Sequence, residues 1–286
     1  MRLLSAIHKS VLSALLLAGV VLLARPATSA DSATFTPTLE AGFRQMYNLD
    51  FDGAHATFQA WEAVHPDDAV GPVSNAAAYL FSEFDRLHIL ESELFTDNNR
   101  FAKRKKQAPD PQTRAAFDRE LAKGDEIAGR VLANSPQDAN ALFAKVMANG
   151  LRGDCAAMIE KRNMAGLGYM KAGRLLAQKL LAQDPSYYDA YLAIGVENYL
   201  LGVSSAPMRW FLRMNGAETN KEDGIAKLRL TAEKGRYLAP FARLLLAVAA
   251  LRDRDRETAR RLLSGLADEF PQNQLYRSEL AQLQLP

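Results

Sequence analysis

The sequence predicts an all-α fold built from helices in pairs. Beyond residue 30, apolar residues recur at spacings of three and four, alanine and leucine are abundant, and proline and glycine gather between the apolar segments. Runs of alternating β-branched residues, which would indicate strands, are absent from the sequence. A third observation is a repeated frame: a small residue is followed four positions later by an apolar residue and eight positions after that by a proline.

This frame occurs four times and divides the chain into comparable segments. Its copies are Ala54, Phe58 and Pro66; Gly124, Ala128 and Pro136; Gly173, Ala177 and Pro185; and Ala259, Leu263 and Pro271. Successive prolines are separated by 70, 49 and 86 residues. The unequal gaps predict that helices are lengthened, or loops inserted, between some copies.

The apolar spacing and the breakers between segments also place the individual helices. The expected ranges are 38–48, 52–64, 71–95, 112–134, 139–151, 154–183, 188–201, 224–235, 240–252, 256–270 and 274–283.

The chain resembles the tetratricopeptide repeat family over residues 36–284. Three stretches carry the resemblance: AGFRQMYNLDFDGAHATFQAWEAVHPDD, LAQDPSYYDAYLAIGVENYLLG and LLLAVAALRDRDRETARRLLSGLADEFPQN. In that 34-residue pattern, small residues let two helices approach closely and a proline ends the second helix. When the chain is aligned with this pattern by its prolines, Gly42, Gly195 and Ala247 fall at a small-residue position of the first helix of a pair. The resemblance implies an irregular α-α superhelix of about five helix pairs with a C-terminal capping helix, similar to uncharacterised exported bacterial repeat proteins.

Two insertions interrupt the repeat domain, which we expect to span residues 31–286. The first covers about residues 96–111 and the second about residues 202–223, because both carry turn residues and little helical periodicity. Loops of this length in a compact array are either functional or disordered.

The first thirty residues have the composition of a cleaved secretory signal. Arg2, His8 and Lys9 precede a thirteen-residue apolar run, and small residues lead to Ala30. The alternative is an uncleaved anchor, but a spanning helix needs roughly 20 apolar residues. No cysteine stands near the cleavage site, so we expect an exported, periplasmic protein that is not a lipoprotein.

Charge and cysteine content exclude two classes of protein. Without residues 1–30, which hold three basic residues and no acid, the chain has 32 basic and 33 acidic side chains. Such a balance does not suit a nucleic-acid-binding protein. Cys155 is the only cysteine, so an intrachain disulfide cannot form.

Each insertion contains a candidate contact surface. The basic run Lys103, Arg104, Lys105 and Lys106 is either a solvated loop or a docking site for an anionic surface of the membrane or envelope. In the second insertion, Trp210 and Phe211 lie among cationic and aliphatic residues. These two side chains either contact a membrane surface or a bound peptide, or pack into a groove of the same molecule.

The sequence offers little for catalysis, metal or cofactor binding. His88 and Glu91 are one helical turn apart with Glu83 nearby, but two ligands do not make a metal site and no H-E-x-x-H motif completes it. The G-x-G at Gly166 and Gly168 lies in a helical pattern without a preceding strand, which indicates close helix contact and not a phosphate loop. We therefore expect no metal, no cofactor and no enzymatic activity.

The resemblance implies that the first helix of each pair lines a concave groove, and the positions concerned are overwhelmingly apolar. They are Leu39, Phe43, Met46, Val73, Ala77, Leu80, Asn140, Phe143, Met147, Asp189, Leu192, Val196, Tyr199, Phe241, Leu244 and Val248. A large exposed apolar surface is unusual on a monomer. We expect the chain to fill this groove itself; the alternative is a partner helix that fills it.

The expected function is a non-catalytic interaction or envelope assembly module with a protein partner and no nucleic acid. The alternative is a carrier of apolar ligands or lipid, with a pocket lined by Phe143, Met147, Val196 and Tyr199. A third possibility, a hydrolase that uses His88 with nearby carboxylates, has weaker support.

Overall fold

The computed structural model describes residues 37–90, 106–203 and 220–284, and in these ranges the fold is helical with no strand. The all-α prediction is therefore confirmed. The predicted signal at residues 1–30 lies outside the described residues. Among the described helices, none is long and apolar enough to cross a membrane.

The helices follow one another along the chain with short connections wherever the connections are described. They are α2 (Leu39–Tyr47), α3 (Phe51–Val64), α4 (Val70–Arg86), α7 (Pro111–Asn134), α8 (Ala139–Asp154) with the π-helical turn η1 (Cys155–Ile159), α9 (Asn163–Gln183), the 3-10 turn η2 (Tyr188–Ala190), α10 (Tyr191–Gly202), α12 (Lys221–Lys234), α13 (Ala239–Arg252), α14 (Arg256–Glu269) and α15 (Gln274–Gln284).

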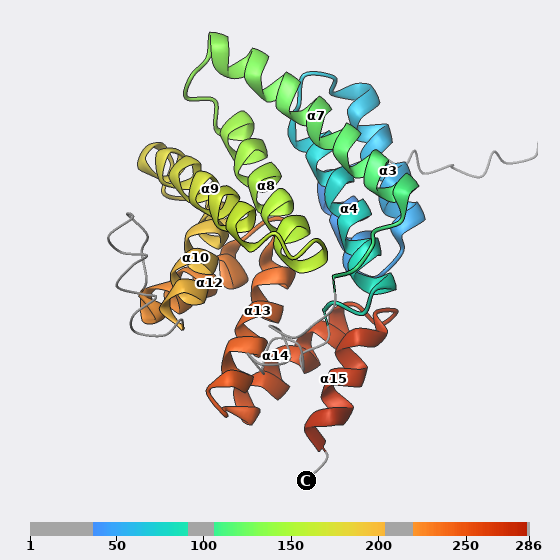
Figure 1. The fold of residues 1–286 in the computed structure, drawn as a ribbon, viewed down its shortest axis with the longest axis vertical. Helices are drawn as coiled ribbons and strands as arrows, with labels where there is room; N and C mark the ends of the chain where they lie inside the picture. The colour runs from blue at the N-terminus through green and yellow to red at the C-terminus, as the bar shows by residue number, and fades with distance from the viewer. Residues whose placement is uncertain (1–36, 91–105, 204–219, 285–286) are drawn as a thin grey trace, which may run out of the picture. The chain divides into compact units, whose positions relative to one another are not determined.

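Helices that are neighbours in this order pack as pairs (Figure 1). The pairs are α2 with α3, α4 with α7, α8 with α9, α10 with α12, and α13 with α14, and α15 packs on α14. Within the described residues this gives the superhelical arrangement of about five pairs and a last helix that the sequence predicts.

Short polar side chains begin most of the helices. The Asp50 carboxylate accepts the N–H of Gly53 at 3.0 Å, and the Asp110 carboxylate accepts the N–H groups of Gln112 and Thr113. Such N-caps satisfy backbone donors that have no partner inside the helix. The other side-chain caps come from Thr38, Asp138, Asn220 and Asp255.

The four prolines of the repeated frame end four helices in the same way. Helices α3, α7, α9 and α14 each stop two residues before their proline. The residue before each proline has φ between −134° and −125° and ψ between 64° and 89°. A following proline disfavours the α conformation, so the second helix of four pairs ends where the sequence predicts.

Small residues allow the two helices of a pair to approach closely. A Cβ atom added to Gly42 on α2 would lie 2.4 Å from Cε1 of Phe58 on α3, and one on Gly195 would lie 3.1 Å from the Gly224 carbonyl oxygen. Ala54 and Phe58 are fully buried. The small and apolar positions of the repeated frame therefore face the interior of the helix pairs, as the alignment with the 34-residue pattern predicts.

The structure corrects the predicted end of the helix at residues 71–95. Helix α4 ends at Arg86, and the chain reverses through His88, whose φ is 52°, while the N–H of Ile89 bonds to the carbonyl of Phe84. Ile89 is buried after this turn. Neither glycine nor proline marks this turn in the sequence. We infer that burial of Ile89 ends the helix here, although the local sequence favours its continuation.

A second correction concerns the boundary between α8 and α9. We expected helices at 139–151 and 154–183, separated near Gly153. Helix α8 instead continues to Asp154 and then through η1, and the break falls at Lys161, whose φ is 56°. Gly153 lies inside the helix, where an added Cβ would be 3.5 Å from the Gly166 carbonyl oxygen of α9. The glycine serves close helix packing and not a turn.

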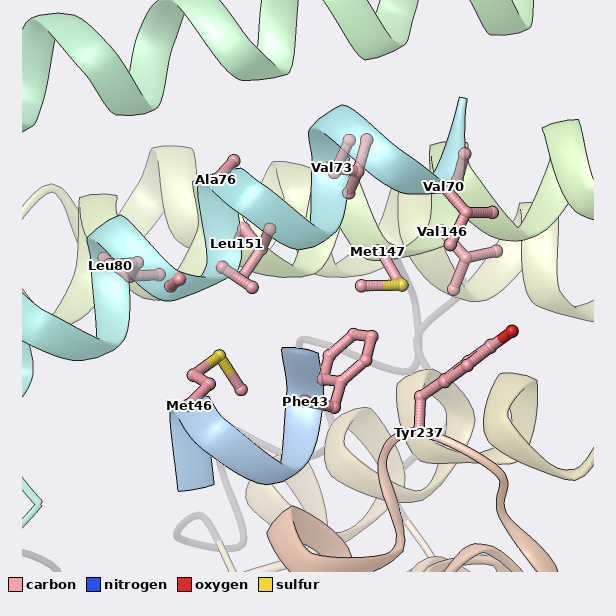
Figure 2. Close-up of a cluster of buried hydrophobic side chains, with 14 of the residues drawn as sticks. Phe43, Met46, Val70, Val73, Ala76, Leu80, Val146, Met147, Leu151 and Tyr237 are labelled. Atoms are coloured by element: carbon pink, nitrogen blue, oxygen red, sulfur yellow. The ribbon is translucent and has the colours of Figure 1, made fainter. Parts of the chain in front are cut away.

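One large apolar core extends from α2 to α15, and a smaller cluster joins α10, α12 and α13. Figure 2 shows the centre of the large core, where Phe43 and Met46 of α2 point toward α4 and α8 and Met147 faces them. Helix α2 thus lies against the first helices of the next two pairs.

Candidate functional site

The face expected to form an open groove is buried. Of its sixteen positions, Asn140 alone is exposed, and Leu192, Val196, Phe241 and Val248 are half-buried. The remaining positions, which include Val73 and Phe143, are buried. The described chain therefore covers most of these positions itself.

Contacts of α2 and α4 with the segment that runs from Tyr237 to α15 cover this face. We call them the closing seam, defined by Phe43, Tyr47 and Phe81 on the N-terminal side and Tyr237, Phe241, Phe270 and Tyr276 on the C-terminal side. The ring centroids of Phe43 and Tyr237 are 5.2 Å apart, and those of Phe81 and Phe241 are 5.4 Å apart. Figure 2 shows Tyr237 beside Phe43.

Hydrogen bonds fix the register of the closing seam. The hydroxyl of Tyr47 donates to the Tyr237 carbonyl at 3.1 Å, and the side-chain amide of Asn273 donates to the Tyr47 carbonyl at 2.8 Å. Both bonds are buried, where an unmade bond would be costly. The ion pair of Arg44 with Glu269, in contrast, is exposed and contributes little.

A buried carboxylate shapes the C-terminal side of the closing seam. Asp189, in η2, accepts the backbone N–H groups of Arg236, Tyr237 and Leu238 at 2.9 to 3.2 Å. Burial raises the pKa of Asp189, and the three N–H donors act against that rise because they favour the carboxylate. Asp189 therefore holds the turn that carries Tyr237 into the core.

The outer face of α9 exposes two large apolar side chains. We use this name for the exposed residues Met164, Gly168, Lys171, Leu175 and Lys179, which recur at helical spacing. Met164 is 78% exposed and Leu175 is 51% exposed. A Cβ on Gly168 would meet nothing within 4 Å, so the surface between the two apolar residues is open.

Helix α9 carries apolar and small residues on its inner side as well as on its outer face. Its Gly166 and Gly173 face α8, where added Cβ atoms would lie 3.0 Å from the Ala157 Cβ and 3.5 Å from the Asn149 Cβ. The close-contact reading of the G-x-G segment thus holds for Gly166, whereas Gly168 faces outward. Met164 and Leu175 were not among the residues predicted to bind a partner, although a helical projection of residues 163–183 places them on one face.

The structure does not gather the four residues of the predicted carrier pocket. Phe143 and Met147 belong to the large core, and Phe143 packs on Tyr187 at 4.9 Å between ring centroids. Val196 and Tyr199 belong to the smaller cluster.

The other candidate surface residues fall mostly outside the described chain. Lys103, Arg104, Lys105, Trp210 and Phe211 are not among the described residues. Lys106 is described and exposed. The roles proposed for both insertions therefore stay predictions.

His55, His65 and Cys155 have structural surroundings. The His55 Nδ1 lies 2.6 Å from the Asn75 side-chain oxygen, and His65 stacks on Trp61. The Cys155 Sγ accepts a hydrogen bond from Arg114, and burial raises the pKa of its thiol to about 11, which disfavours the reactive thiolate. Within residues 37–90, 106–203 and 220–284, no three His, Cys, Asp or Glu side chains are grouped to hold a metal ion. Glu91 lies outside these ranges.

No protein-family model, curated protein or solved structure is significantly similar to this chain.

Proposed function

We propose that this protein is a non-catalytic interaction module, and that its protein partner docks on the outer face of α9. The observation that carries the proposal is the pair of exposed apolar side chains, Met164 and Leu175, on one face of a single helix. Exposed apolar residues that share one face are typical of protein–protein contacts.

The filled groove supports this choice of surface. Repeat proteins commonly bind ligands on a concave face, but here the apolar positions of that face are buried by the chain itself. Recognition by this protein therefore uses residues that remain exposed on second helices, such as α9.

The chemistry of the face specifies the kind of partner. Met164 and Leu175 are eleven residues apart, with the exposed cations Lys171 and Lys179 on the same face. An amphipathic helix offers apolar anchors at this spacing, and acidic residues beside the anchors would complement the lysines. We propose an acidic amphipathic helix as the partner element.

Family and location complete the proposal. The matching geometry of the four proline-terminated helices supports a tetratricopeptide-like repeat. The composition of residues 1–30 supports export to the periplasm with cleavage before Asp31. N-terminal sequencing of the protein isolated from its native cells would contradict cleavage before Asp31 if Met1 were retained.

The binding surface is tested by substitution on α9. A protein with Met164→Ser and Leu175→Ser is immobilised and compared with the unchanged protein for capture of envelope proteins, identified by mass spectrometry. A matched control carries Val64→Ser, because Val64 on α3 is 62% exposed and is not part of the α9 face. We expect one stoichiometric partner to be lost from the α9 variant and kept by the control.

Two other outcomes would contradict this assignment. Undiminished capture by the folded α9 variant would exclude the α9 face. Loss of capture in a Trp210→Ala, Phe211→Ala variant, with the α9 variant unaffected, would move the interaction surface to the second insertion.

A further inference from the structure

A cavity of about 280 Å³ lies at the closing seam, between α2, the end of α4, α13 and the start of α15. Its deeper wall is formed by buried residues, among them Met46, Phe84 and Tyr276. Its rim contains exposed polar residues, which are Asp85, His88, Gln274 and Ser278. The cavity is therefore apolar inside and polar at its opening.

The size of the cavity limits what it can hold. An apolar cavity of about 150 Å³ accommodates benzene, so this cavity has room for about ten carbon atoms by the same proportion. A two-chain lipid is too large, whereas a single medium-length chain or a pair of fused aromatic rings fits.

The rim specifies the polar end of such a molecule. Asp85 and His88 both line the opening, and both residues are exposed. A carboxylate in this position favours a cationic or hydrogen-bond-donating group and disfavours an anion.

We infer that this cavity is a binding site for a small amphiphile with an apolar body of about ten carbons and an amine or hydroxyl end. A bound molecule would contact both sides of the closing seam, because Met46 belongs to α2 and Leu244 to α13. Its occupancy would therefore stabilise the closed array by binding the folded state alone. This site is independent of the α9 face and differs from the groove pocket expected from the sequence.

The test measures binding of decan-1-amine and decanoate to the purified protein by isothermal titration calorimetry, below the concentrations at which either probe aggregates. We expect saturable binding of one molecule of decan-1-amine, with decanoate about two- to fivefold weaker, as expected for an exposed charge contact. In an Asp85→Asn variant this preference for the amine should disappear.

A second variant tests the cavity itself. Leu275 is half-buried and lines the cavity, so Leu275→Trp should fill it and weaken decan-1-amine binding at least tenfold. Leu283→Trp is the matched control, because Leu283 is also half-buried on α15 but does not line the cavity. If Leu275→Trp fails to fold, Leu275→Ala should enlarge the cavity and favour dodecan-1-amine over decan-1-amine relative to the unchanged protein.

Three results would overturn the inference. They are the absence of saturable binding to the unchanged protein, equal binding to a folded Leu275→Trp variant, and an unchanged order of the two amines in Leu275→Ala.

Discussion

At the scale of single residues, small side chains set the distance between paired helices. Gly42 lets the ring of Phe58 lie directly against the α2 backbone, and Phe58 in turn packs edge-on to Phe43 with 5.4 Å between ring centroids. Native cores are packed too densely to absorb an added group at such a contact. The two paired helices therefore depend on the absence of a Cβ atom at Gly42.

Gly42→Ala should destabilise the protein by about 1–3 kcal/mol, because the new Cβ would lie 2.4 Å from Phe58 and force the pair apart. The matched control is Gly129→Ala on α7, where an added Cβ meets nothing within 4 Å. The control should gain up to about 1 kcal/mol from helix propensity. Urea unfolding of both variants checks these signs, and equal effects of the two substitutions would contradict the packing argument.

Asp154, at the end of α8, provides a prediction about pH. Burial raises its pKa to about 7, and burial is the one cause of this shift. The folded protein thus holds this proton more tightly than the unfolded chain, whose aspartate pKa is about 3.9. The stabilisation is complete below about pH 4 and is lost as the pH rises to about 7.

Asp154→Asn keeps a neutral side chain at every pH. We expect its free energy of unfolding, relative to the unchanged protein, to increase by about 1–3 kcal/mol between pH 5 and pH 8. Denaturant unfolding at each pH gives this difference. A constant difference across the range would show that Asp154 does not titrate there.

At the scale of elements, the sequence predicts the helices whose ends are set locally. Proline fixes the ends of α3, α7, α9 and α14, and polar caps such as Asp50 fix several starts. The end of α4 and the break before α9 depend instead on tertiary burial of Ile89 and Ile159, which local patterns do not contain. The candidate surface on α9 was missed because apolar residues lie on both the inner and the outer side of this helix, so the sequence pattern does not separate the exposed ones.

Substitution of Asp189 tests how strongly its carboxylate holds η2 against the turn that precedes α13. Asp189→Ala should cost about 2–4 kcal/mol, because three backbone N–H groups that precede α13 lose their acceptor. Asp67→Ala is the control, since the Asp67 side chain is 82% exposed in its ion pair with Arg130. The control should change stability by no more than about 0.5 kcal/mol. Thermal unfolding of both proteins measures the contrast, and similar losses would contradict a special role for Asp189.

At the scale of the whole molecule, the contacts of α2 and α4 with residues 237–276 determine which residues of the described chain are exposed. Aromatic packing and buried hydrogen bonds stabilise the closing seam. The ion pair of Arg44 with Glu269 lies at its solvent-exposed edge. A domain that opened here would expose Phe43 and Val73 as an apolar groove. The proposed binding face on α9 follows from the seam staying closed.

An intramolecular cross-link tests this closure most directly. Arg44→Cys and Glu269→Cys are placed in a Cys155→Ser background, so that the two introduced thiols are the only ones. The side chains they replace are in contact, with 3.3 Å between Arg44 Nη1 and Glu269 Oε1. An Asp67→Cys, Arg130→Cys protein serves as the positive control, because that pair is also in contact.

A short bismaleimide should join residues 44 and 269 within one chain as readily as it joins the control pair, and should do so in native protein and not in urea. Mass spectrometry of the linked peptides identifies the product. Efficient linkage of the control without any link between residues 44 and 269 would show that the array is open in solution, and would contradict the filled groove on which the account depends.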